Sequence, residues 1–182
     1  FTRPVNLASA AFLVDGNRFV EAIIAPSFDD DAFELLTTKP KWGKNVRLLS
    51  LGDFDAAGRD ASDIEVKKVV GGFLLQGRDL KSVSDGELKV ATKTQPTVEQ
   101  LTSLRFAEKI GKHVKSNAIV FVKGTRVTGV GAGQMSRVDS THLAARKSGE
   151  EAQGTVMASD AFFPFPDGVE AAMDAGVTAI LQ

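Results

Sequence analysis

The sequence predicts an α/β fold in which a parallel sheet is covered by helices. Two short apolar runs, at 21–26 and 46–51, have the composition of buried strands. Between them, 27–39 opens with acidic residues and carries apolar residues at helical spacing. This strand–helix–strand order is typical of a parallel sheet with helices on its faces. The 182 residues are enough for one domain with a substantial core.

The elements before and after this unit follow from local signals. Asn6 is a favourable N-cap for a short helix over 7–14. The segment 53–63 has the composition of a loop. In 65–79, strand residues are interrupted by Gly71 and Gly72, which predicts a β-bulge or a close backbone approach. We expect 86–93 to be an edge strand.

The second half of the chain contains the most regular predicted helix, 97–116, with Thr97 as its N-cap. Two strands, 117–124 and 126–133, follow it and are joined by a turn at 123–125. The remaining predicted elements are helices at 136–148 and 167–176 and strands at 154–159 and 177–182.

Composition narrows the possible functions. The formal net charge is −1, so no bulk positive field favours nucleic acid or an anionic membrane as a partner. The chain has no cysteine, which suits a reducing compartment such as the cytoplasm. We find no signal-peptide pattern and no apolar run near the roughly 18 residues of a membrane span. Because the chain starts at Phe1 and ends in a strand-like segment, we expect it to be a piece of a longer protein.

A glycine-rich turn at 127–140 is the first candidate site. Gly129, Gly131 and Gly133 come between a predicted strand and a helix that begins near Ser136. Such glycines let a ligand approach backbone N–H groups, and Arg137 in the first turn favours an anionic or carbonyl partner. The spacing of the glycines matches neither the Walker A loop nor the dinucleotide-binding G-x-G-x-x-G pattern. The alternative is tight helix–strand packing beside a solvated arginine.

Two further segments lie where α/β proteins bind ligands, at the ends of strands. Asn117 could orient an amide or a ring through paired contacts, or it could cap the preceding helix. The segment 159–168 carries three phenylalanines and two prolines, so it forms a stiff loop rather than a helix or central strand. Its aromatic faces beside Asp167 suit a planar heterocycle, or they cover a sheet edge while Asp167 caps the next helix.

Several of these segments together resemble one family, the AICAR transformylase/IMP cyclohydrolase family of purine biosynthesis. "KSNAIV", "GVGAGQMSRVDS" and "SDAFFPFPDGVEAAMDAGVTAI" are similar to the C-terminal half of its formyltransferase domain. "EAIIAPSFDDDAFELL", "RLLSLG" and "GGFLLQGRD" follow the family pattern in the same order, so the resemblance covers nearly all of 1–182.

The resemblance implies a three-layer α/β/α fold of the cytidine-deaminase-like type, without zinc. It implies transfer of the formyl group of 10-formyltetrahydrofolate to the 5-amino group of AICAR, in a cytoplasmic homodimer. Asn117 matches a catalytic, substrate-contacting asparagine, and Arg137 matches a second substrate contact. The matches to the folate pocket are Val138, Phe162, Phe165 and Asp167, of which Phe162 also lines the AICAR site. Ser116 and Asp160 match a potassium site.

The resemblance also defines what this chain is expected to lack. The Lys-His pair of the family lies upstream of the matched region, so we expect 1–182 alone to be inactive as a formyltransferase. We expect the cyclohydrolase domain to be missing as well. Pro166 stands where the family pattern has an arginine. Two alternatives remain open, a non-catalytic α/β nucleotide- or folate-binding module and a dimerisation module.

Overall fold

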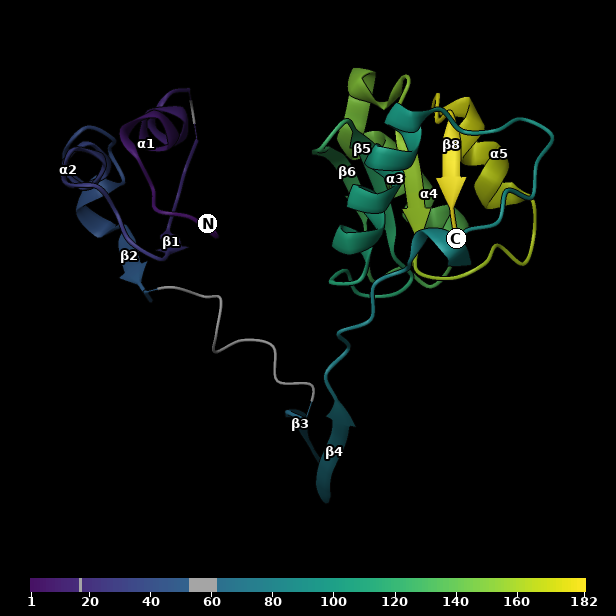
Figure 1. Cartoon of the computed structure of the whole chain (residues 1–182), viewed down its shortest axis with the longest axis horizontal. Helices are drawn as coiled ribbons and strands as arrows, with labels where there is room; N and C mark the ends of the chain where they lie inside the picture. Colours follow the sequence, from purple (N-terminus) through teal and green to yellow (C-terminus); the bar gives the residue numbers. More distant parts are fainter. Residues whose placement is uncertain (17, 53–61) are drawn as a thin grey trace. The chain divides into compact units, whose positions relative to one another are not determined.

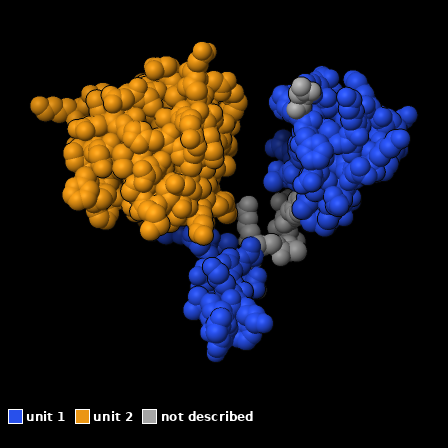
Figure 2. Space-filling view, turned by 180° about the vertical axis from the view of Figure 1, so that it is seen from behind, with its two compact units in different colours: residues 1–81 blue, residues 82–182 orange. Residues whose placement is uncertain are grey.

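The computed structural model describes residues 1–16, 18–52 and 62–182 and has the predicted mixed α/β character. The chain forms two compact units, Phe1–Lys81 (unit 1) and Ser82–Gln182 (unit 2) (Figure 2). Within the described residues, no helix has the length and apolar character that crossing a membrane requires.

Unit 1 begins with the predicted strand–helix–strand arrangement. Its elements are α1 (Leu7–Val14), β1 (Ala22–Ala25), α2 (Asp30–Thr38), the 3₁₀ turn η1 (Gly43–Asn45) and β2 (Arg47–Ser50) (Figure 1). β1 and β2 pair in parallel, as predicted. Asn6 caps α1 by accepting a hydrogen bond from the Ser9 amide at 3.0 Å. The core of this part contains Leu36 and Trp42.

The rest of unit 1 is a hairpin of β3 (Ile64–Val69) and β4 (Gly72–Gly77). The predicted bulge at Gly71 and Gly72 is wrong, because Gly71 lies in the hairpin turn with a φ of 87° that favours glycine. Every residue of both strands is exposed. Of the predicted loop 53–63, residues 53–61 lie outside the described part of the chain.

The predicted edge strand at 86–93 is wrong. A 3₁₀ turn, η2 (Asp85–Glu87), occupies its start, and the described residues that follow form no strand before α3 (Val98–Gly111). A strand is held by hydrogen bonds to a neighbouring strand, and no strand of the described chain pairs with this segment. Its local composition alone could not supply that partner.

Unit 2 is built on a four-stranded sheet with the order β6-β5-β7-β8. Its further elements are β5 (Ile119–Lys123), β6 (Arg126–Gly131), α4 (Arg137–Ser148), the 3₁₀ turn η3 (Gly149–Ala152), β7 (Val156–Ser159), α5 (Asp167–Asp174) and β8 (Ala179–Leu181). Only β7 and β8 are parallel, since β5 runs antiparallel to both β6 and β7. The predicted turn at 123–125 is confirmed by the β5–β6 hairpin, and the parallel pairing inferred from 21–51 does not extend to most of the sheet in unit 2.

Helices pack on both faces of this sheet (Figure 1). Strand side chains alternate between faces, so Val120 and Val122 pack with Leu104 of α3. Ile119 and Phe121 instead join the cluster that contains Ala144 of α4 and Ala172 of α5. β5 is thus buried on both sides, which holds its ends and those of β7 firmly in place.

Candidate functional site

All the predicted site residues lie in unit 2, at or near the ends of its elements. Ser116 and Asn117 precede β5, Asp160 follows β7, and the loop with Phe162 and Phe165 leads to α5. β5 and β7 are antiparallel, and Ile119 pairs with Ser159. The start of β5 therefore lies beside the end of β7, which brings the first two segments together.

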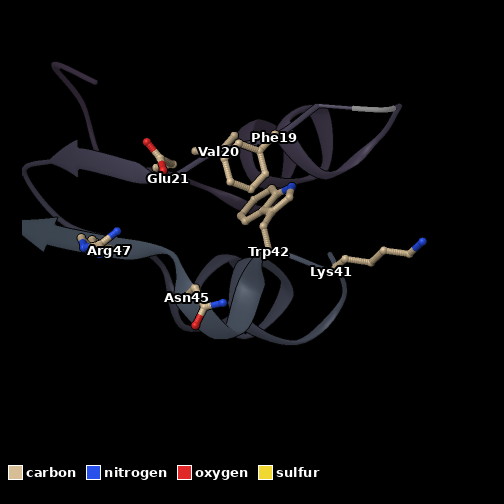
Figure 3. A pocket seen from close by; sticks show the side chains of 7 residues that line it. All are labelled: Phe19, Val20, Glu21, Lys41, Trp42, Asn45 and Arg47. Carbon is tan, nitrogen blue, oxygen red and sulfur yellow. The ribbon is translucent and has the colours of Figure 1, made fainter.

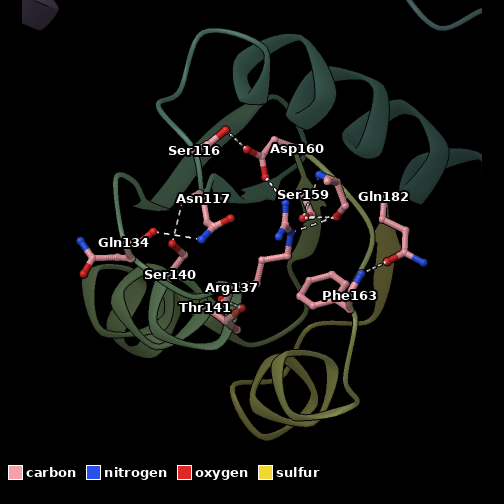
Figure 4. A network of polar contacts seen from close by, with 11 residues as sticks. Ser116, Asn117, Gln134, Arg137, Ser140, Thr141, Ser159, Asp160, Phe163 and Gln182 are labelled. Atoms are coloured by element: carbon pink, nitrogen blue, oxygen red, sulfur yellow. Dashed lines mark hydrogen bonds and ion pairs between the residues drawn. The ribbon is translucent and has the colours of Figure 1, made fainter.

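Arg137 is paired with Asp160 rather than solvated. Its Nη2 lies 3.2 Å from Asp160 Oδ1, and its Nε donates to the carbonyl oxygen of Ala161 at 3.3 Å (Figure 4). The two side chains are only 19% and 18% exposed. Arg137 is the first residue of α4, where the helix dipole disfavours a cation, so the carboxylate offsets that cost. The alternative of a free, solvated arginine is wrong.

The second oxygen of Asp160 accepts a hydrogen bond from the Ser116 hydroxyl. Two oxygen-bearing side chains that are 44 positions apart in the sequence therefore meet at one point. Oxygen atoms are the ligands that hard cations prefer, so the two side chains fit a shared potassium ion chemically. Arg137 competes for the same carboxylate, and the potassium site stays a prediction.

Asn117 is fixed by hydrogen bonds on its amide and backbone. Its Nδ2 donates to the carbonyl oxygen of Gln134 at 3.0 Å, and its own carbonyl oxygen accepts from the Ser140 hydroxyl at 2.7 Å (Figure 4). Its Oδ1 accepts no hydrogen bond from the described residues. The alternative of a helix C-cap is wrong, because α3 ends at Gly111 and is capped at Lys112.

Gln134 and Ser140 are site residues that the sequence argument did not single out. Both position Asn117, one through a main-chain carbonyl and one through a hydroxyl. A main-chain contact leaves no mark on residue type. Ser140 is a polar residue fully buried on α4, and that burial is visible only in the structure.

The glycine-rich turn serves helix–strand packing. A Cβ atom at Gly131 would overlap the carbonyl oxygen of Ser140, and one at Gly129 would overlap that of Ala144. Gly133 has a φ of 67°, and its N–H donates to Lys115 O at 2.9 Å. The close-packing interpretation is therefore confirmed for Gly129 and Gly131.

The aromatic loop divides into one packed ring and two exposed rings. Phe163 packs in the cluster around Ile119 and Phe121, and its N–H donates to Gln182 Oε1 at 2.9 Å. Phe162 and Phe165 are each 68% exposed. One phenylalanine covers the core, and the other two present their faces to solvent.

Asp167 and Val138 lie at the starts of neighbouring helices. Asp167 is the first residue of α5 and not its N-cap, which is Pro166. Its Oδ1 accepts from the Gly168 amide at 2.7 Å, so the carboxylate still satisfies one free amide of the first turn. A Cβ at Gly168 would lie 3.8 Å from the Val138 amide nitrogen. α4 and α5 therefore begin close together.

The site is an open surface of unit 2. A pocket of about 460 Å³ in this unit is lined in part by the start of α3 and the β5–β6 turn, and by none of the predicted site residues. What the surface offers is a half-satisfied amide, a partly buried guanidinium with Nη1 unused among the described residues, and two exposed rings.

Comparison with known proteins decides the family. The family model described as AICARFT/IMPCHase bienzyme matches residues 1–147. The chain belongs to this family. The matched range includes Ser116, Asn117, Arg137 and Val138, and it confirms the resemblance seen in the sequence.

Curated relatives extend the match across nearly the whole chain. The bifunctional purine biosynthesis protein PurH of Rhodopirellula baltica is 45% identical over 180 residues, which are 99% of this chain and 34% of that protein. The PurH of Oceanobacillus iheyensis is 46% identical over 180 residues, again 99% of this chain and 34% of that protein. That of Magnetococcus marinus is 49% identical over 174 residues, 90% of this chain and 32% of that protein. The chain thus spans about a third of the length of these relatives.

Proposed function

We propose that this chain is the C-terminal part of an AICAR formyltransferase domain and supplies part of its substrate and folate pocket. The reaction forms a bond between the 5-amino nitrogen of AICAR and the formyl carbon and breaks the bond from that carbon to N10 of the folate. The amine loses one proton and the leaving N10 gains one, so no net proton is released. Membership of the bifunctional family and the arrangement around Asn117 support this proposal.

The single observation that carries the proposal is the half-satisfied amide of Asn117. Its NH₂ group is held by Gln134 O, so its Oδ1 is oriented and able to accept from a ligand N–H. A fixed acceptor can hold the amine of AICAR in line with the formyl carbon, and such positioning lowers the entropic part of the barrier. Moving the proton of the amine is assigned to the Lys-His pair of the family, upstream of this chain.

Arg137 and the exposed rings complete the proposed pocket. Asp160 and Ala161 O fix the guanidinium through Nη2 and Nε, and Nη1 remains available to AICAR. Phe162 and Phe165 provide flat faces for the folate, while Phe162 also borders AICAR. Val138 contributes apolar contact, and Asp167 accepts from the pterin N–H groups.

Further properties belong to the same proposal. Unit 2 corresponds to the cytidine-deaminase-like α/β/α subdomain without zinc. The active enzyme is a cytoplasmic homodimer with AICAR and folate as its small-molecule ligands. Ser116 and Asp160 would hold a potassium ion, and no step of the reaction is assigned to it.

Titration of the chain with AICAR and a folate analogue tests the pocket. We expect both to bind and Arg137→Ala to weaken AICAR about tenfold, the effect of losing one charge-assisted hydrogen bond. Arg126→Ala is the matched control, because Arg126 pairs with Glu151 away from the site. Absence of AICAR binding, or an equal loss in both variants, contradicts the proposal.

Asp167→Ala separates a role in folate recognition from a role in starting α5. We expect the folate analogue to bind about tenfold more weakly and AICAR to be little affected. Asp174→Ala, at the other end of α5, is the control. An equal loss for both ligands would show that Asp167 only supports its helix.

Turnover distinguishes a transferase from a binding module that has lost its chemistry. We expect the longer protein that contains this chain to formylate AICAR and Asn117→Ala to lower its kcat more than it raises KM. A longer protein that binds both ligands without turnover would favour the binding module.

A further inference from the structure

A second candidate site lies in unit 1, in a pocket of about 240 Å³ lined mostly by apolar surface. Phe19, Val20 and Trp42 form its apolar part, and Glu21, Lys41, Asn45 and Arg47 its polar part (Figure 3). None of these residues belongs to the site proposed in unit 2. We propose that this pocket binds a small planar aromatic ring that carries one carboxylate.

The aromatic wall of the pocket is held in place. Trp42 is only 8% exposed, and its Nε1 donates to the carbonyl oxygen of Arg18 at 2.9 Å. A Cβ at the adjacent Gly43 would lie 2.7 Å from the carbonyl oxygens of Leu36 and Thr37, so η1 packs directly on the end of α2. The indole is therefore fixed before any ligand arrives, which lowers the ordering cost of binding.

Phe19 supplies the second aromatic surface. It lines the same pocket as Trp42, and it is 74% exposed (Figure 3). Aromatic rings gain from offset-stacked or edge-to-face contact with a further ring, beyond the apolar area that they bury. Pockets for drug-sized ligands hold about 300–1,000 Å³. The smaller volume here favours a single or fused ring.

The polar groups specify the charge of the ligand. Glu21 and Arg47 lie at the starts of the paired strands, where Arg47 N donates to Glu21 O at 2.9 Å. In the described chain, neither an ion pair nor a hydrogen bond engages the side chains of Lys41, Asn45 and Arg47. The ammonium of Lys41 points away from the two rings, so Arg47 is the cation that a ligand beside the rings would meet (Figure 3). Its guanidinium pairs with no carboxylate of the described chain and can bind one negative charge. The guanidinium matches a carboxylate in two-point geometry.

The experiment uses 2-naphthoate as the probe and the indole N–H resonance of Trp42 as the readout. Trp42 is the sole tryptophan of the chain, so its signal reports on this pocket alone. We expect 2-naphthoate to shift the resonance with saturation and the neutral 2-naphthamide to bind about tenfold more weakly. This comparison requires no substitution. A resonance unmoved by millimolar 2-naphthoate, or equal binding of acid and amide, overturns the proposal.

Two variants test which residue binds the carboxylate of the ligand and which contacts its ring. Arg47→Gln is expected to weaken 2-naphthoate about tenfold and to leave 2-naphthamide unchanged. Arg3→Gln is the matched control, an exposed arginine of unit 1 outside the pocket. Phe19→Ala is expected to weaken both compounds about fivefold, because the lost ring contact does not depend on charge. An equal effect of Arg3→Gln and Arg47→Gln, or none of Phe19→Ala, overturns the assignment.

Discussion

The two units differ in how far helices bury their strands. In unit 2, α3 packs on one face of a four-stranded sheet and α4 and α5 on the other. In unit 1, the sheets have two strands each, and the β3–β4 hairpin has no buried residue. The apolar side chains of β4 make the contrast plain, since Phe73 and Leu75 are each 65% exposed whereas Phe121 of β5 is fully buried.

This difference explains why the predicted site lies in unit 2. A site needs side chains held within a fraction of an ångström, and rigid elements provide that better than isolated strands. Burial of β5 on both faces fixes Asn117 at its start, and its pairing with β7 fixes Asp160. The pocket in unit 1 obtains rigidity in another way, from Trp42 and the packing of Gly43.

The largest expected effect contrasts two phenylalanines in strands. Phe121→Ala should destabilise the chain by about 3–5 kcal/mol, because it opens a cavity in a fully buried layer. Phe73→Ala should change stability by no more than about 0.5 kcal/mol, because its ring is 65% exposed. Urea unfolding followed by circular dichroism measures both. Equal costs would show that the hairpin is covered in solution.

Two glycines provide the next contrast. Gly131→Ala should cost about 1–3 kcal/mol or more, because the new methyl group would overlap the carbonyl oxygen of Ser140 and push α4 off the sheet. A Cβ at Gly72 has no atom within 4 Å, so Gly72→Ala should be nearly neutral. Thermal unfolding of the two variants gives the comparison. A tolerated Gly131→Ala would mean that α4 packs less closely than described.

Local signals in the sequence predicted most helices correctly. Asn6, Thr97 and Ser136 were expected at helix starts, and all three accept the capping hydrogen bonds. Asp167 was misjudged by one position, because the φ of Pro166, −71°, already suits the helix and makes Pro166 the cap. Helix starts that are set by side chains nearby in the sequence are therefore predictable from the sequence.

The pairing of β5 with β7 was not predictable from local signals, although the family resemblance already placed Ser116 and Asp160 in one site. The contact of Ser116 with Asp160 joins residues 44 positions apart and depends on β5 running antiparallel to β7. The spacing of apolar residues and the local composition place both residues at strand ends, but they do not give the order of the strands in the sheet. The pocket around Trp42 was missed for a similar reason, since its lining comes from two separate stretches, 19–21 and 41–47.

Ion pairs give a smaller contrast between the units. Asp160→Asn should cost about 1–2 kcal/mol, because Arg137 would lose a charged partner in a site that is less than one-fifth exposed. Asp15→Asn should cost at most about 0.5 kcal/mol, since its contact with Lys39 is long, at 3.9 Å, and exposed. Unfolding at low and high salt checks this assignment. High salt should abolish the effect at Asp15 and leave most of that at Asp160.

The smallest expected difference concerns helix caps, where the two units should behave alike. Thr97 caps α3 in unit 2 by accepting from the Gln100 amide at 3.2 Å, and Asn6 caps α1 in unit 1 by accepting from the Ser9 amide at 3.0 Å. Thr97→Ala and Asn6→Ala should each cost about 1 kcal/mol, because a cap satisfies an amide of its own first turn whatever covers the helix.

Hydrogen exchange at the Gln100 and Ser9 amides measures this directly, with Thr102→Ala, in the middle of α3, as the control. We expect exchange to accelerate by a similar factor at both amides and only within the affected first turn. A much larger loss in α3 than in α1 would show that cap strength depends on the surrounding layers. Equal losses would show that the helix caps of the two units are equally strong. The units would then differ only in how far tertiary packing buries their elements.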